Sequence, residues 1–369
     1  MPKIPKIRFN TGNRAQFYHV LKQRVGTHLA ARGADRYADR RVWLKGAIYT
    51  VIALTAYSSI VLNQVTGWIA LIAAVAYGSA ILLLAINLGH DAAHDTLSRK
   101  PWINRVVQSA IFALLGANSY LWRLRHVKSH HTFPNVNGCD IDIDENPFLR
   151  LSPNHPRRPW QRFQHLYAPI TYWLVALHTI FYQDFVYLRK RQLANMIDIV
   201  HPWWVYALFV AGKVVYITVT FAVPIALVDL PWWQILLGAL FASGASSILF
   251  VTLLIGTHFT EEASFPAVDE NHRLPHSWAE HALLTAVDWS PSSRLAAFIA
   301  GGVNAHAAHH LFPSLSHVHY RELSAIIRQT AREFGVRYNE TTLTKMLASH
   351  FRFLRSLSRD ELQPSALRA

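Results

Sequence analysis

Two pairs of long apolar segments constrain the fold more than any other feature of this 369-residue chain. The first pair covers residues 46–63 and 67–88, and the second covers residues 203–228 and 232–258. Each segment approaches or exceeds the roughly 20 residues that a helix needs to cross the hydrocarbon core of a bilayer. Only a short turn separates the members of each pair, so the sequence predicts two transmembrane helical hairpins.

The composition agrees with a membrane protein and excludes several other classes. Hydrophobic residues make up 51% of the chain and charged residues only 16%, well below the roughly 25% typical of a soluble domain. The single cysteine, Cys139, excludes a disulfide framework and a thiolate metal site. The N-terminal segment has no short apolar stretch followed by a cleavage site, so it does not resemble a secretory signal.

The net charge of +14 indicates an orientation in the membrane. Every Lys and Arg except Lys213 lies in segments 1–45, 91–200 or 259–369, and the two hairpin turns contain none. Positive residues favour the cytoplasmic side, so we expect all three segments there and no nucleic-acid partner. Lys213, inside the third apolar run, either lines a polar interior or snorkels, and we assign it no function.

Two shorter apolar stretches, 106–118 and 166–182, raise a question of topology. The first is too short to span a bilayer, but the second is long enough. If it crossed, the histidine-rich segments before and after it would lie on opposite sides of the membrane. Since we expect them on one side, we predict that 166–182 is interfacial or re-entrant. Its flanking arginines and lysine suit a helix lying on anionic lipid.

Histidine is unusually frequent, with 21 residues, and three clusters stand out. They are His90-x-x-x-His94 at the end of the second run, His126-x-x-x-His130-His131, and His306-x-x-His309-His310. On a helix, positions i and i+4 share a face, so His90 can point with His94 and His126 with His130. His131 is rotated by about 100° from His130, so adjacent histidines can serve different metals. His258, at the end of the fourth run, is a further candidate.

Nine imidazoles exceed the coordination sphere of one ion and fit two. On ligand chemistry alone, such a set suits Zn, Fe, Cu or Ni. Zinc pairs usually share bridging carboxylates, so an all-histidine pair near a lipid interface favours iron that activates oxygen.

The same motifs resemble the membrane fatty acid desaturase superfamily over most of the chain. They are His90-Asp91-x-x-His94, Trp122-Arg123-x-x-His126-x-x-x-His130-His131, Pro134-Asn135 with Gly138-x-Asp140-x-Asp142, Asn304-x-His306-x-x-His309-His310-Leu311-Phe312-Pro313, and His317-x-x-Tyr320. The order of the three boxes is specific to the superfamily and much less specific to one reaction. Leu254 stands where some relatives have an Asn ligand, and His306 stands where front-end desaturases usually have Gln.

The resemblance implies an all-α integral membrane fold. Four transmembrane helices in two hairpins, with interfacial helices, would lie beneath a cytoplasmic helical cap that holds a di-iron site. The expected segments are a basic N-terminal part (1–45), the hairpins with their intervening cytoplasmic region (46–258, with 89–202 between the hairpins) and a cap containing the third box (259–369). The implied iron ligands are His90, His94, His126, His130, His131, His258, His306, His309 and His310.

Further side chains are expected around the irons. Four are candidates to support the ligands by hydrogen bonding, as residues behind a metal ligand commonly do: Asp91, Asp140, Asn304 and His317. Three basic residues, Arg123, Arg125 and Lys128, are candidates to bind a phosphate or carboxylate head group, with the alternative that they belong to the cytoplasmic flank.

The predicted activity is O2-dependent insertion of a double bond into a fatty acyl chain, presented as a CoA ester, a lipid or a free acid. Abstracting hydrogen from an unactivated methylene needs metal–oxygen chemistry that no side chain supplies. No His-Pro-Gly-Gly motif of a fused cytochrome b5 domain occurs, so a ferredoxin or a cytochrome b5-like protein is the expected electron donor. The alternatives are a hydroxylase, a carotenoid oxidase or a 1-alkene-forming decarboxylase on the same scaffold, and a histidine-rich metal transporter or sensor.

Overall fold

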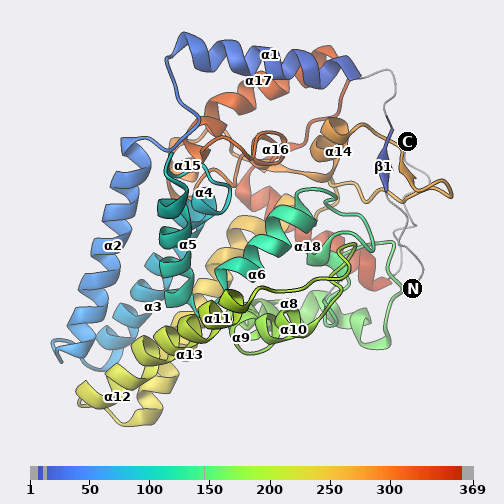
Figure 1. Cartoon of the computed structure of the whole chain (residues 1–369). Helices are drawn as coiled ribbons and strands as arrows, with labels where there is room; N and C mark the ends of the chain where they lie inside the picture. The colour runs from blue at the N-terminus through green and yellow to red at the C-terminus, as the bar shows by residue number, and fades with distance from the viewer. Residues whose placement is uncertain (1–6, 11–14, 145, 360–369) are drawn as a thin grey trace.

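The computed structural model describes residues 7–10, 15–144 and 146–359 (Figure 1). Within these ranges, four helical spans are long and apolar enough to cross a membrane: Arg40–Val61, Gly67–Ala93, Trp203–Leu227 and Trp232–Thr257. They form two hairpins, and α2 and α3 lie side by side in Figure 1. The prediction of an all-helical membrane fold with two transmembrane hairpins is confirmed.

The hairpin spans contain several consecutive elements. These are α2 (Arg40–Val61), then α3 (Gly67–Leu84), η1 (Ala85–Gly89) and α4 (His90–Ala93), then α11 (Trp203–Ile217), η5 (Thr218–Ala222) and α12 (Val223–Leu227), and finally α13 (Trp232–Leu254) and η6 (Ile255–Thr257). The span that begins with α3 carries the first histidine pair beyond the apolar run. Trp68, Trp203 and Trp232, at the span starts, are 80%, 80% and 64% exposed, as expected for anchors at a membrane interface.

The segment between the hairpins consists of short helices. They are α5 (Pro101–Leu115), α6 (Ser119–Arg123), η2 (Leu124–His130), α7 (Ile141–Asp144), η3 (Pro159–Phe163), α8 (Gln164–Trp173), α9 (Val175–His178), η4 (Thr179–Gln183) and α10 (Asp184–Arg189). The apolar stretch 166–182 is therefore broken into three pieces, and α8 contains Pro169. Neither this stretch nor α5 is among the helices of membrane length. The interfacial position of 166–182 stays a prediction.

Lys213 of α11 lines a polar interior. Its Nζ donates to Asp184 at 2.8 Å and to the carbonyls of Gly116 and Ile180, both at 2.6 Å. A largely buried ammonium needs such partners, since an unpaired charge in an apolar medium costs several kcal/mol. The contacts fasten α10 and the end of α5 to a transmembrane span.

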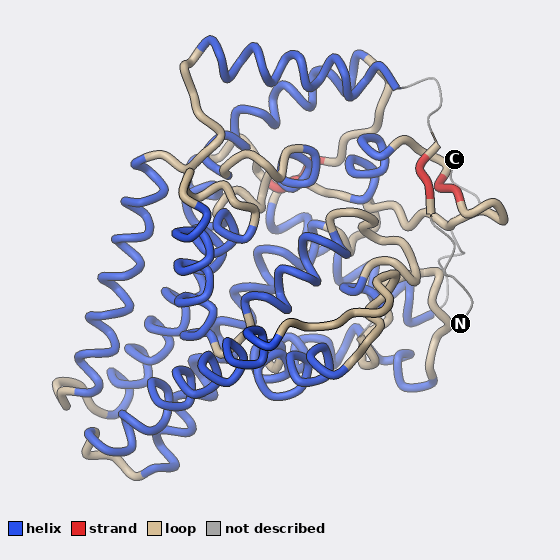
Figure 2. The backbone as a smooth tube through the Cα atoms, in the orientation of Figure 1, coloured by secondary structure: helices blue, strands red, loops and turns tan. Residues whose placement is uncertain are grey.

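The cap is also helical. It contains α14 (Trp278–Thr285), α15 (Arg294–Ala300), α16 (His306–Leu311), η7 (His317–His319), α17 (Tyr320–Glu333) and α18 (Leu343–Arg359). Two short parallel pairs, β1 (Arg8–Phe9) with β2 (Arg273–Leu274) and β3 (Asp288–Trp289) with β4 (Glu340–Thr341), tie distant loops together (Figure 2).

The basic N-terminal segment does not stand apart from the cap. Its helix α1 (Ala15–Ala31) lies along α17 at the top of Figure 1. Phe17 and Leu21 of α1 are fully buried in the cluster that contains Leu323 and Ile327 of α17. The cap thus encloses α16, with its histidines, between α17 and the top of the membrane hairpins.

Candidate metal centre

Each histidine cluster is positioned by the end of a helix. His90 and His94 follow η1 at the end of the second span, and His126 and His130 lie in η2. His258 follows η6 at the end of the fourth span, and α16 carries the third cluster. Both η1 and η2 are π-helical turns, which occur frequently at functional sites.

The π-turn changes which histidines of the second cluster face each other. We expected His126 and His130 to share a helical face. In η2 the backbone N–H of His131 instead donates to the carbonyl of His126, five residues earlier. The Nε2 atoms of His126 and His131 consequently lie 3.1 Å apart, while His130 turns toward His258. The second cluster therefore contributes to both sides of the site.

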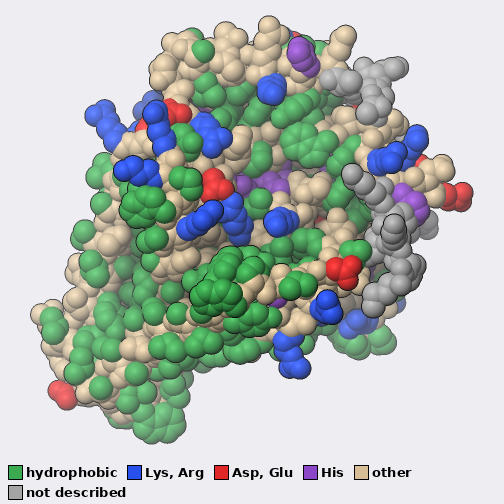
Figure 3. Space-filling view, in the orientation of Figure 1, with side chains coloured by type: hydrophobic (Ala, Val, Ile, Leu, Met, Phe, Trp, Pro, Cys, Tyr) green, Lys and Arg blue, Asp and Glu red, His purple; other side chains and the backbone are tan. Residues whose placement is uncertain are grey.

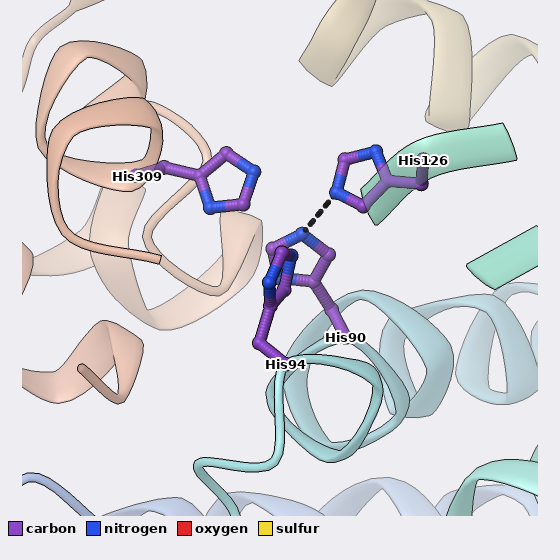
Figure 4. Close-up of side chains that lie close together, drawn as sticks. All are labelled: His90, His94, His126 and His309. Atoms are coloured by element: carbon purple, nitrogen blue, oxygen red, sulfur yellow. Dashed lines mark hydrogen bonds between the residues drawn. The ribbon is translucent and has the colours of Figure 1, made fainter. Parts of the chain in front are cut away.

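The nine predicted ligands gather in one place and form two main groups. The inner histidine group contains His130, His258, His306 and His310, and all four are buried. The outer histidine group contains His90, His94, His126 and His309, of which His94 and His126 are partly exposed (Figure 4). In each group, one ring nitrogen per residue lies within 4.8 Å of the others. His131 lies between the groups, close to His309 and His310.

Hydrogen bonds fix the Nδ1 proton in three of the four inner histidines, while Nδ1 of His310 has no partner among the described residues. His258 Nδ1 lies 2.8 Å from the Thr285 carbonyl, and His306 Nδ1 lies 3.1 Å from the Val303 carbonyl. His130 Nδ1 lies 3.1 Å from an oxygen of Asp140. Because these oxygens only accept hydrogen bonds, each Nδ1 carries the proton and each Nε2 presents a lone pair.

These lone pairs point at one another. His258 Nε2 lies 3.1 Å from His130 Nε2, 2.7 Å from His306 Nε2 and 3.0 Å from His310 Nε2. With its proton on Nδ1, His258 cannot donate from Nε2 to any of these neighbours. A bound cation resolves the conflict: with metal–nitrogen bonds of about 2.0–2.1 Å, neighbouring ligand nitrogens lie about 2.9–3.4 Å apart. The residues present therefore fit a metal ion.

The outer group is less firmly held. His90 Nε2 lies 3.0 Å from His126 Nε2. Among the residues that the structure describes, the Nδ1 atoms of His90 and His309 have no hydrogen-bond partner. The Trp122 ring stacks on the His126 imidazole, with 4.5 Å between ring centroids. Histidine side chains are visible in the middle of the face shown in Figure 3, with Lys and Arg side chains nearby.

Burial keeps most of these imidazoles neutral, as metal ligation requires. Burial lowers the pKa of His306 to about 3, and burial together with neighbouring imidazoles lowers the pKa of His309 and His310 well below 6.5. His130 differs: burial opposes the charged form, but the Asp140 and Asp142 carboxylates outweigh it and raise the pKa. The carboxylates therefore favour the charged ring of His130, and a metal ion bound at its Nε2 would take the place of the second proton.

The predicted supporting residues lie at different distances from the histidines. Asp140 contacts His130 directly. Asp91 instead accepts from Ser316 Oγ at 2.5 Å and lies 3.0 Å from His317 Nδ1. Asn304 donates to the Ser290 carbonyl at 3.3 Å. Of these four residues, only Asp140 has a hydrogen bond to one of the nine histidines among the described contacts.

A partner of His317 was not foreseen. Its Nε2 lies 2.7 Å from Nζ of Lys45, and that ammonium also donates to Asn87 at 2.6 Å. Lys45 is 7% exposed and directly precedes the first apolar run. No local pattern pairs residues 272 positions apart, so only the tertiary fold reveals this contact.

The three predicted head-group residues differ in their surroundings. Arg123 pairs with Asp95, and Arg125 pairs with Asp142 and donates to Gln183 at 3.0 Å. Lys128 is exposed. Of the three, only Arg125 lines the cavity beside the histidines.

That cavity has a volume of about 500 Å³ and reaches both histidine groups. Its wall includes His126 and His309 of the outer group and His130, His258 and His306 of the inner group. Away from the histidines, α8, α9 and α13 supply mainly apolar side chains, among them Val175, Leu177 and Phe250. An apolar cavity with a few polar groups at one end is typical of a site for a hydrophobic ligand.

The fold and site together define a membrane protein whose clustered histidines can hold metal ions and face an apolar cavity. The chain belongs to the fatty acid desaturase family, which matches residues 66–342. The predictions of this family, and of an oxidoreductase that desaturates fatty acyl chains, are thereby confirmed.

Several relatives align along nearly the whole chain. The sn-1 linoleoyl-lipid 6-desaturase of Arthrospira platensis is 28% identical, over 94% of this chain and 94% of its own length. The protein of the same name from Synechocystis sp. is 28% identical over 93% and 96%. The acyl-lipid (8-3)-desaturase B of Dictyostelium discoideum is 26% identical over 94% of this chain and 76% of its own length.

Proposed function

We propose that this protein is an O2-dependent, two-iron desaturase acting on the acyl chain of a membrane lipid. The observation that carries the metal assignment is the convergence of three Nε2 lone pairs, from His130, His258 and His306, in the buried inner group. The nine histidines named above would hold the two ions. An all-imidazole set with no thiolate is compatible with iron on ligand softness.

Iron bound there would supply, together with O2 and two electrons, the oxidising power to remove hydrogen from an unactivated methylene. The chain's own residues orient and enclose the reaction. Asp140 and the carbonyls of Thr285 and Val303 hold the inner imidazoles in one tautomer. Val175, Leu177 and Phe250 line the cavity with apolar surface, which holds a methylene chain beside the histidines and excludes water.

The acyl-lipid substrate follows from two supports. Three relatives are named as acyl-lipid or linoleoyl-lipid desaturases, and the cavity wall includes α8 and α13, so a chain anchored in a bilayer can reach it. Arg125 and Gln183, at the polar part of the wall, are the candidates to contact the ester or phosphate oxygens. Linoleoyl lipid is the first substrate to test.

We further propose that the site faces the cytoplasm and that the electrons come from a separate ferredoxin or a cytochrome b5-like protein. The distribution of positive charge supports the orientation, since nearly all Lys and Arg flank the spans on the side of the cap. Partial exposure of His94 and His126 supports electron entry at the outer group.

The decisive experiment combines metal analysis with product analysis on the purified full chain. We expect close to two irons per chain and, with O2, reductant and linoleoyl lipid, a product with one more double bond and an unchanged carbon number. His306→Ala should reduce bound iron and abolish turnover. His281→Ala removes an equally buried histidine outside both groups and serves as the matched control. Product analysis by mass spectrometry would falsify desaturation if it found added oxygen or a chain one carbon shorter.

A further inference from the structure

A second cavity, of about 490 Å³, lies between the two transmembrane hairpins. Its wall is built from α2, α3, α11, α12 and α13, with contributions from the ends of α5, α9 and η4. Among the described residues, none of the nine histidines lines it. We call it the membrane cavity, and we call the cavity beside the histidines the catalytic cavity.

The two cavities lie next to each other along α13. Residues of the Trp233–Ser246 stretch line the membrane cavity, and Phe250, Val251 and Leu254 line the catalytic cavity. They also share a thin wall. Ala176 and Ile180 face the membrane cavity, whereas Val175, Leu177 and Thr179 face the catalytic cavity. The chain passes from α9 into the π-turn η4 within this wall.

The lining of the membrane cavity is mainly apolar. Tyr57 donates to the Val219 carbonyl and Ser246 donates to the Ala242 carbonyl, both at 2.8 Å, whereas the buried Tyr77 hydroxyl has no partner among the described residues. Lys and Arg are absent from the described lining. The surrounding medium is bilayer hydrocarbon, and an empty apolar space of this size would forfeit the packing contacts of its walls.

Small residues keep the space open. Ala74 of α3 and Gly238 of α13 both line it. A Cβ placed on Gly238 would meet only the Cβ of Ala74, at 3.9 Å. A large side chain at position 238 can therefore enter the cavity without first displacing the backbone of a neighbouring helix.

We propose that the membrane cavity binds one hydrocarbon chain. The chain could come from a bilayer lipid that enters between the hairpins, or it could be the distal end of a substrate whose reacting part lies in the catalytic cavity. In either case the bound chain packs against Ala176 and Ile180 and so supports the wall of the catalytic cavity. This inference does not require that the protein be a two-iron enzyme.

Photolabelling tests the proposal directly. The full chain, in lipid nanodiscs, is exposed to a phosphatidylcholine that carries a diazirine near the end of one acyl chain, and labelled peptides are mapped by mass spectrometry. We expect labels on inward residues of Gly67–Ile81 and Trp233–Ser246. Gly238→Leu should lower this labelling at least fivefold, because the leucine occupies the space.

Gly212→Leu is the matched control. It makes the same change in a membrane span where a Cβ meets no atom within 4 Å, at a residue that does not line the cavity. Ala74→Phe fills the cavity from the opposite helix and guards against misfolding of one variant, with folding checked by size-exclusion elution and metal retention. Equal labelling in Gly238→Leu, Ala74→Phe and Gly212→Leu, or labels confined to outward residues, would overturn the proposal.

A third substitution identifies the source of the chain. Leu177→Trp narrows the catalytic cavity only, since Leu177 does not line the membrane cavity. If labelling of the membrane cavity persists in this variant, the occupant is a bilayer lipid. If labelling is lost together with turnover, the occupant is the distal end of the substrate. Both results support hydrocarbon binding.

Discussion

The two histidine groups differ in how the protein holds them. In the inner group, His130, His258 and His306 each donate Nδ1–H to a fixed oxygen, and all four members are buried. The fourth member, His310, has no partner for Nδ1 among the described residues. In the outer group, the same is true of His90 and His309, and two members are partly exposed. The inner group is thus the more rigid and the outer group the more open. If each group holds one ion, as proposed, the inner ion should be the more tightly held and the outer ion the more accessible.

The carboxylate behind His130 provides the largest expected difference between the groups. Asp140→Ala removes the acceptor that fixes the His130 ring, and loss of such a supporting residue typically costs about 10–100-fold in metal affinity. We expect this loss for the inner ion and little change for the outer one, measured by competition with a chelator of known affinity.

Asp144→Ala is the control for that substitution. Asp144 is the last residue of α7, which begins directly after Asp140, and it pairs with His155 at 3.0 Å, outside both histidine groups. Because Asp140 also accepts the backbone N–H of Asn135 and Asp142, the unfolding midpoint of the metal-free variant must be measured alongside. An equal loss of both ions in Asp140→Ala would contradict the distinction between the two groups.

The rate of metal loss from the unmodified protein also tests whether the two groups differ. We expect a smaller difference here than in Asp140→Ala. With a chelator in excess, we expect two kinetic phases of equal amplitude, separated by about tenfold in rate if the difference in barrier is about 1.4 kcal/mol. His94→Ala should remove the fast phase and leave the slow phase. A single phase that releases both ions would show that burial and ring anchoring do not distinguish the groups.

Much of this architecture follows from the sequence, and particular residues show where such reasoning stops. Apolar runs of membrane length predict the two hairpins because hydrocarbon thickness fixes the length of a span. The sequence also places the histidines at helix ends. Helix α1 and the start of α2 at Arg40 were not predicted, because their sequences are polar and hydropathy does not detect amphipathic helices.

The π-turns mark a second limit. No local motif encodes the wider turn of a π-helix. The α-helical spacing therefore predicted His130 as the neighbour of His126, whereas the structure places His131 there. The contact of Lys45 with His317 is a third case, since its partners lie 272 residues apart. The sequence also does not show that His94 is partly exposed and His310 buried, because their burial depends on how the cap packs over α16.

His281 is a buried histidine outside both groups and serves as a reference for them. The expected effect of its substitution on stability is the smallest of those predicted here. Burial lowers the pKa of His281 to about 4, although its bond to the Pro134 carbonyl opposes the shift. Its pKa is about 6.5 when unfolded, so below pH 6.5 the unfolded chain binds more protons. The contribution of the neutral His281 ring to the free energy of unfolding is therefore full above pH 6.5. It is lost progressively as the pH falls toward 4.

His281→Gln tests this behaviour, because glutamine can still donate to the Pro134 carbonyl, 2.9 Å from His281 Nε2, but does not titrate. Between pH 7.5 and 6.0, the free energy of unfolding of the variant should fall by about 1 kcal/mol less than that of the parent protein. The measurement is denaturant unfolding in detergent micelles, on protein loaded with metal so that the ligand histidines cannot take up protons while folded. If the free energy of unfolding changed equally with pH in the parent and the variant, His281 would not titrate on unfolding. The pH dependence of stability would then belong to the histidines of the two groups.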